Sequence, residues 1–157
     1  MNAYLFPGLE LSPRIVEQIV KQIPGARYDD KTDPDRFSLR EAVAHLADWE
    51  PILRDRIVLA VEKPDSPVQG MDESVRATDK NYPAWDVTES LRTFSAERAK
   101  TIAFLRSLAV KDWSKAVDHN EKGRQTVMDQ ANQFLGHDLY HIEHLMGFFE
   151  EKVAGTW

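Results

Sequence analysis

Apolar residues recur with helical spacing in four stretches of the chain, and clusters of Pro, Gly, Asp and Asn separate these stretches. The first stretch opens at Ser12-Pro13, where a typical N-cap residue precedes a proline at the first helical position. It stops at Pro24-Gly25, a pair that disfavours further helix. We therefore expect the first helix to lie between these two signals.

The next two helices also carry start signals in the sequence. The second opens with SLRE, a capping box that begins at Ser38, and continues to about Val61. The third begins within residues 86–89 and continues to about Ala109. Both contain apolar residues at the three- and four-residue spacing of one buried helical face.

The fourth helix opens with TVMD at Thr126 and is expected to reach about Lys152. No segment shows sustained strand alternation, and the Val-containing patches SPVQ and KAVDH are expected to be too short for a sheet. Residues 64–86 are expected to form a long irregular connection, which in a compact domain is typically functional or loosely ordered. The pattern predicts an all-α antiparallel four-helix bundle with a long loop between helices 2 and 3.

Three of the five histidines fall within GHDLYHIEHL in the fourth predicted helix. On a helical projection, His137 and His141 lie on nearly the same side at the edge of the apolar stripe, whereas His144 leans toward the flank. Their Cβ atoms are about 5–6 Å apart at this spacing, so the two imidazoles can converge on one point. His45, on the flank of the second helix's stripe, is a third candidate. A metal site between two helices is one interpretation; ordinary polar residues on a helix face are the other.

Two acids fall near the centres of apolar stripes, Glu50 in the second helix and Asp138 in the fourth. A buried carboxylate needs a partner, and pairing with an arginine is the favoured interpretation. The alternative is that each accepts the second N–H of a metal-binding imidazole. His119 lies in a polar loop and is expected to be a surface residue. The candidate arginines are Arg54, Arg56, Arg92, Arg98 and Arg106.

Composition narrows the class of protein. A length of 157 residues predicts one domain, residues 1–157, and the absence of cysteine excludes disulfides, thiolate zinc sites and a cysteine nucleophile. The net charge of −6, from 26 acidic and 20 basic side chains without a basic cluster, argues against a nucleic-acid partner. With neither a signal peptide nor a run of about 18 apolar residues, no membrane partner is expected and a cytoplasmic location is predicted.

Two blocks of the sequence resemble a known family. RFSLREAVAHLADWE and DWSKAVDHNEKGRQTVMDQANQFLGHDLYHIEHL are similar to the second-helix and C-terminal signatures of the DinB-like superfamily, in the family's order and separation. The resemblance implies a four-helix bundle that binds one divalent metal through His45, His137 and His141. Phe37 replaces the family's usual Trp, and His144 stands where relatives commonly have Gln. Neither departure touches the implied ligands.

The resemblance leaves the activity open. The first hypothesis is a metal-dependent enzyme that transfers a low-molecular-weight thiol or hydrolyses a small substrate, with the 64–86 connection, which carries Tyr82 and Trp85, as its lid. The second is a non-catalytic metal-binding stress-response protein, and the third is a metal-free bundle. Zinc is the expected ion, with nickel, iron and manganese as alternatives. A small-molecule substrate is expected, and the resemblance also implies a homodimer.

Overall fold

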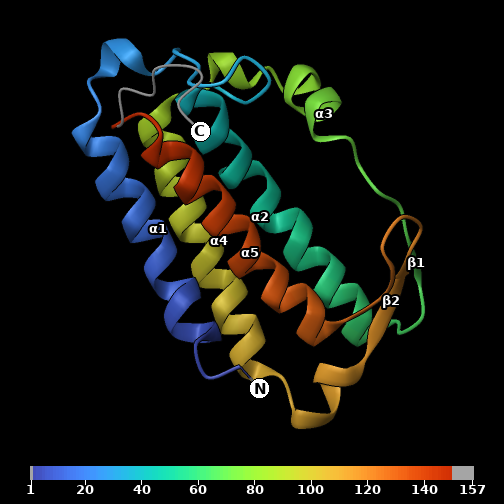
Figure 1. Cartoon of the computed structure of the whole chain (residues 1–157). Helices are drawn as coiled ribbons and strands as arrows, with labels where there is room; N and C mark the ends of the chain where they lie inside the picture. The colour runs from blue at the N-terminus through green and yellow to red at the C-terminus, as the bar shows by residue number, and fades with distance from the viewer. Residues whose placement is uncertain (1, 150–157) are drawn as a thin grey trace, which may run out of the picture.

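Four long helices form a bundle in the computed structural model, which describes residues 2–149 (Figure 1). The four-helix bundle predicted from the sequence is therefore confirmed, with a small sheet added at one end. The long helices are α1 (Leu5–Gln22), α2 (Leu39–Glu62), α4 (Val87–Ser107) and α5 (Val127–Met146). The shorter elements are α3 (Glu73–Asp79), the 3-10 helices η1 (Gly25–Arg27), η2 (Tyr82–Ala84) and η3 (Val110–Ser114), and the strands β1 (Pro67–Val68), β2 (Ala116–His119) and β3 (Gly123–Thr126).

The helices run in pairs, with α1 and α5 in one direction and α2 and α4 in the other (Figure 1). At the start of α2, Arg40 donates a hydrogen bond to the carbonyl of Trp85, just before α4 begins. Further along both helices, Glu50 pairs with Arg98. The pairs α1–α2 and α4–α5 are antiparallel, whereas α2 and α4 are parallel. The connection between α2 and α4 is long because it must return along a 24-residue helix, which is about 36 Å.

The first helix begins earlier than predicted. It starts at Leu5 and continues through Pro13, so the interpretation of Ser12 as its N-cap is wrong. Proline lacks the N–H that would bond the carbonyl of Leu9, and Arg98 donates to that carbonyl instead at 3.3 Å. The Ser12 hydroxyl is buried and donates to Asp138. The predicted end before Pro24 is confirmed.

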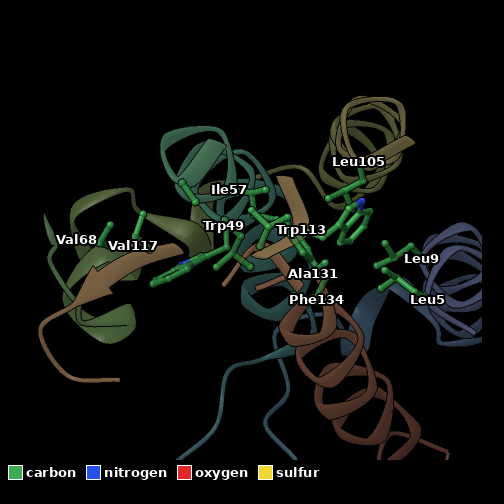
Figure 2. Close-up of a cluster of buried hydrophobic side chains, with 13 residues drawn as sticks. Leu5, Leu9, Trp49, Ile57, Val68, Leu105, Trp113, Val117, Ala131 and Phe134 are labelled. Carbon is green, nitrogen blue, oxygen red and sulfur yellow. The ribbon is translucent and has the colours of Figure 1, made fainter. Parts of the chain in front are cut away.

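The long connection is more ordered than predicted, and the expectation that its Val-containing patch forms no sheet is wrong. β1 pairs in parallel with β2, with Val68 opposite His119, and β2 pairs antiparallel with β3. Strands this short need support from packing. Val68 and Val117 supply it by burying their side chains in the core cluster that also contains Trp49 and Trp113 (Figure 2).

The capping boxes identified in the sequence are confirmed at the starts of α2 and α5, where Ser38 and Thr126 are the N-caps. α5 ends at Met146 and residues 147–149 form a turn, so the prediction that the helix continues through them is wrong; its predicted end at about Lys152 lies outside the described residues. In this turn the Phe148 side chain is buried and that of Phe149 is 40% exposed.

The core has two main parts along the bundle. One, shown in Figure 2, lies where the sheet meets α1, α2, α4 and α5. The other lies toward the start of α2 and the end of α5. No helix within residues 2–149 combines the length and the apolar character needed to cross a membrane.

Candidate metal centre

α2 and α5 bring the three predicted histidines together. His45 lies in the second turn of α2, and His137 and His141 lie one turn apart on α5. The two helices pack antiparallel, so their side chains meet across the interface (Figure 1). One ring nitrogen from each histidine lies within 4.8 Å of the others. The Nε2 atoms of His45 and His137 are 2.9 Å apart.

The spacing of these nitrogens fits a divalent ion. Two nitrogens bound at about 2.0–2.1 Å to a tetrahedral ion lie about 3.3 Å apart. The observed separations, from 2.9 Å to at most 4.8 Å, bracket that value. Within the described part of the chain, this is the one group of three or more His, Asp or Glu side chains found with metal-like spacing.

All three imidazoles are neutral at pH 7. Burial and, to a smaller extent, the neighbouring His137 together lower the pKa of His45 to about 3. Burial also lowers the pKa of His137 to about 4 and that of His141 well below its usual range. A neutral imidazole has a lone pair to donate, so metal binding here need not displace protons at pH 7.

Several ring nitrogens in this cluster have no protein partner. The Nδ1 atoms of His45 and His141 are buried and make no hydrogen bond to any described residue. A buried unpaired polar atom costs free energy, and such atoms commonly mark a functional site or a missing ligand. The opposite nitrogen of His45, Nε2, faces Nε2 of His137 at 2.9 Å, so these two rings are directed toward one another.

The buried acids belong to a different cluster. Arg98 of α4 pairs with Glu50 through Nε at 2.7 Å and with Asp138 through Nη1 at 2.6 Å. The predicted pairing with arginine is confirmed, and the alternative in which each acid supports a histidine is not observed. This network links α2, α4 and α5 beside the histidines, since Asp138 directly follows His137 on α5, and Ser12 adds α1 to it.

Aromatic rings cover His45. Phe37 and Trp49 lie with their centroids 5.3 Å from its imidazole, and Tyr82 lies at 6.4 Å. The Tyr82 hydroxyl donates to Asp48 at 2.7 Å. This bond holds the long connection against α2, so the connection covers the site as expected of a lid; its movement stays a prediction.

Glu73 is a site residue that sequence reasoning missed. It begins α3, and its Oε2 atom lies 3.7 Å from Nε2 of His45. With His137 and Trp49 it lines a cavity of about 560 Å³ that opens beside the histidines. Only a start signal for α3, Asp72 followed by an acid, was visible in the sequence, and nothing there placed this helix over the site.

The other two histidines differ from expectation in burial. His144, expected toward the flank, is 2% exposed, but its ring centroid is 6.5 Å from that of His141 and it lies outside the cluster. His119, expected at the surface, is 6% exposed and lines the cavity from the end of β2. Its burial follows from the sheet that the sequence pattern did not predict.

Comparisons with known proteins agree with this fold. A candidate metal-dependent hydrolase of Oceanobacillus iheyensis is 23% identical over 146 residues, which cover 92% of this chain and 83% of that protein. The structure of YfiT from Bacillus subtilis, described as a probable metal-dependent hydrolase with an unusual four-helix bundle topology, matches with a TM-score of 0.85 at 21% identity. That match covers 92% of this chain and 83% of YfiT. Residues 9–145 match the DinB superfamily, and the chain belongs to this superfamily.

Proposed function

We propose that this chain is a metal-dependent hydrolase that acts on a small molecule. The observation that carries the proposal is the convergence of three neutral imidazoles, two buried and one half-buried, beside a cavity of about 560 Å³. The two similar proteins described above as hydrolases support it. A divalent ion in such a site supplies Lewis acidity and lowers the pKa of bound water to about 7.

The proposal gives each nearby side chain a role. His45, His137 and His141 would hold the ion through their ring nitrogens. Glu73 would accept at Oε2 the proton that a water molecule loses as its oxygen attacks the substrate, and would return it to the leaving group, since its carboxylate lies at the cavity wall, 3.7 Å from His45. The Trp49 ring excludes water from the inner end of the cavity.

The donor set narrows the choice of ion. Three imidazole nitrogens suit zinc, and nickel, iron and manganese can occupy similar sites when they are more available. Zinc is therefore the ion we propose first.

The test is a hydrolysis assay with p-nitrophenyl acetate on protein purified without a histidine tag. Wild-type protein is compared with protein stripped of metal and then reloaded with zinc. Removing one general acid–base group commonly lowers a rate by about 10²–10⁴-fold. We therefore expect Glu73→Gln to retain its metal and lose activity on this scale, whereas His144→Gln, which changes a buried histidine outside the cluster, keeps its activity.

Parallel reactions separate the proposal from its alternatives. Glutathione and 1-chloro-2,4-dinitrobenzene test thiol transfer under the same conditions. Zinc-dependent consumption of the thiol without ester hydrolysis would replace the hydrolase with a transferase. If the protein binds metal but shows neither activity, the result would favour the alternative of a non-catalytic metal-binding protein.

A further inference from the structure

The cavity beside the histidines has a second end, distant from the metal centre. Its inner end is lined by His137 and Glu73, and its outer end is lined by Arg56 of α2 and Lys122 of the β2–β3 turn. Arg56 lies eleven residues after His45 on the same helix, which is about 16 Å along the axis. A ligand that fills the cavity therefore meets two chemically different ends.

Arg56 is a half-buried cation without a carboxylate partner among the described residues. Its contacts are a hydrogen bond from Nη2 to the carbonyl of Gln69 at 3.2 Å and the Trp49 ring at 6.0 Å. Burial lowers its pKa, and the charge of Glu121 offsets only part of this effect. By contrast Arg54, two residues earlier on α2, pairs with Glu97 at 2.7 Å.

His119 adds a fixed donor to the same end. Its Nδ1 atom accepts a hydrogen bond from the backbone N–H of Glu121 at 3.2 Å. Burial and the positive charges of Arg56 and Lys122 lower its pKa, so the ring is neutral at pH 7. A neutral imidazole that accepts at Nδ1 carries its proton at Nε2. That N–H has no partner in residues 2–149.

Lys122 completes the set. It lines the cavity together with Arg56 and His119, and its positive charge lowers the pKa of both His119 and His137. Its ammonium forms no ion pair with any described carboxylate. The carboxylate of the neighbouring Glu121 instead packs against Gly70, where only the absence of a Cβ leaves room for it.

We propose that Arg56, Lys122 and the Nε2–H of His119 form an anion subsite, and that the substrate is a small molecule bearing a carboxylate or phosphate group. Three groups of donors face one end of the cavity. Charge-assisted hydrogen bonds to a carboxylate or phosphate are the strongest use of such a set. The inference rests on the proposed function only in taking this ligand as the substrate, because the subsite itself needs no metal.

The test is a calorimetric titration of metal-free protein with inorganic phosphate and, separately, with acetate. We expect saturable binding of at least one of the two anions. Arg56→Gln and Lys122→Gln are each expected to weaken it about tenfold, the scale of losing one charge-assisted hydrogen bond. Arg54→Gln is the matched control, because it removes an ion-paired arginine from the same helix, and we expect its affinity to equal that of the wild type.

Each outcome decides the proposal. Preference for phosphate or for acetate identifies the anionic group of the substrate. Absence of saturable binding by both anions, or equal affinity in wild type, Arg56→Gln and Lys122→Gln, overturns the subsite. Since Lys122 is exposed, its substitution tests the subsite even if Arg56→Gln fails to fold. Because the protein is metal-free, failure of the metal centre leaves this result unaffected.

Discussion

Two polar clusters lie within one turn of each other in the bundle, and they differ in how fully their atoms are paired. The Arg98 guanidinium donates to both oxygens of Glu50, to both oxygens of Asp138 and to Ser12. In the histidine cluster, by contrast, the Nδ1 atoms of two rings have no partner in the described protein. The Arg98 network is almost inaccessible to solvent, whereas in the histidine cluster His45 and His141 are buried and His137 is half-buried.

This difference indicates that the Arg98 network stabilises the fold and that the histidine cluster binds a ligand. A network whose donors and acceptors are all satisfied by the protein stabilises one arrangement of the helices. The histidine cluster instead leaves the Nδ1 atoms of His45 and His141 unpaired, at a cost in free energy, and turns Nε2 of His45 toward His137, where an ion could bind. Arg98 fixes the positions of α2, α4 and α5, and the histidines beside this network use that fixed geometry.

The largest effect is expected from Arg98→Met. This change leaves Glu50 and Asp138 buried without a cation, and breaking a buried pair in this way costs about 3–5 kcal/mol. Urea denaturation of metal-free protein measures the loss. As a matched control, Arg106→Met removes an arginine from the exposed pair with Glu10 and should change the free energy of unfolding by less than about 1 kcal/mol. Equal losses in the two variants would show that the buried network contributes no more to the free energy of unfolding than the exposed ion pair does.

A smaller effect is expected from Ser12→Ala. The Ser12 hydroxyl donates to the Asp138 carboxylate at 2.5 Å, and a hydrogen bond to a charged group contributes about 1.5–3 kcal/mol. The free energy of unfolding should fall by this amount in the same denaturation experiment. If Ser12 instead acted as a helix cap, Ser12→Asn would restore stability; we expect no rescue, because α1 begins at Leu5.

The lowered pKa values of the buried histidines predict that the free energy of unfolding of the metal-free protein depends on pH. An unfolded imidazole binds a proton near pH 6.5, whereas the pKa of His45 is about 3 and that of His144 about 4 in the folded chain. The unfolded state therefore binds more protons between about pH 4 and 6.5, and the free energy of unfolding decreases as the pH falls through this range.

At pH 5 the loss is about 1–2 kcal/mol per buried histidine relative to pH 7. Denaturation of the metal-free wild type at both pH values measures the total loss in the free energy of unfolding. The His144→Gln variant should lose less than the wild type, by the contribution of one buried histidine. Identical pH dependence in the variant and the wild type would show that His144 is protonated as readily in the folded chain as in the unfolded one.

Much of the bundle was predictable because it depends on local signals. Capping boxes at Ser38 and Thr126 and the helical spacing of apolar residues determine α2 and α5, and the same spacing directs His45, His137 and His141 toward their interface. Choosing these three histidines rather than His144 required two arguments: the side of the helix on which each one lies, and the resemblance to the DinB-like superfamily.

The remaining features depend on contacts between distant segments. Ser12-Pro13 has the local pattern of a helix start, but Arg98, far away in the sequence, satisfies the carbonyl that Pro13 leaves free. β1 and β2 are stable only because Val68 and Val117 reach a shared core. Glu73 of α3 and His119 of β2 reach the cavity because distant segments pack together, so the spacing of apolar residues along the chain did not reveal their role.

The central claim is that His45, His137 and His141 hold one divalent ion, and elemental analysis of untagged protein tests it most directly. We predict about one equivalent of metal per chain in the wild type and a large loss in each of the three Ala variants. His144→Ala and His119→Ala, which change the other two histidines, should retain the wild-type content. Equal metal content in all five variants, or none in the wild type, would contradict the claim.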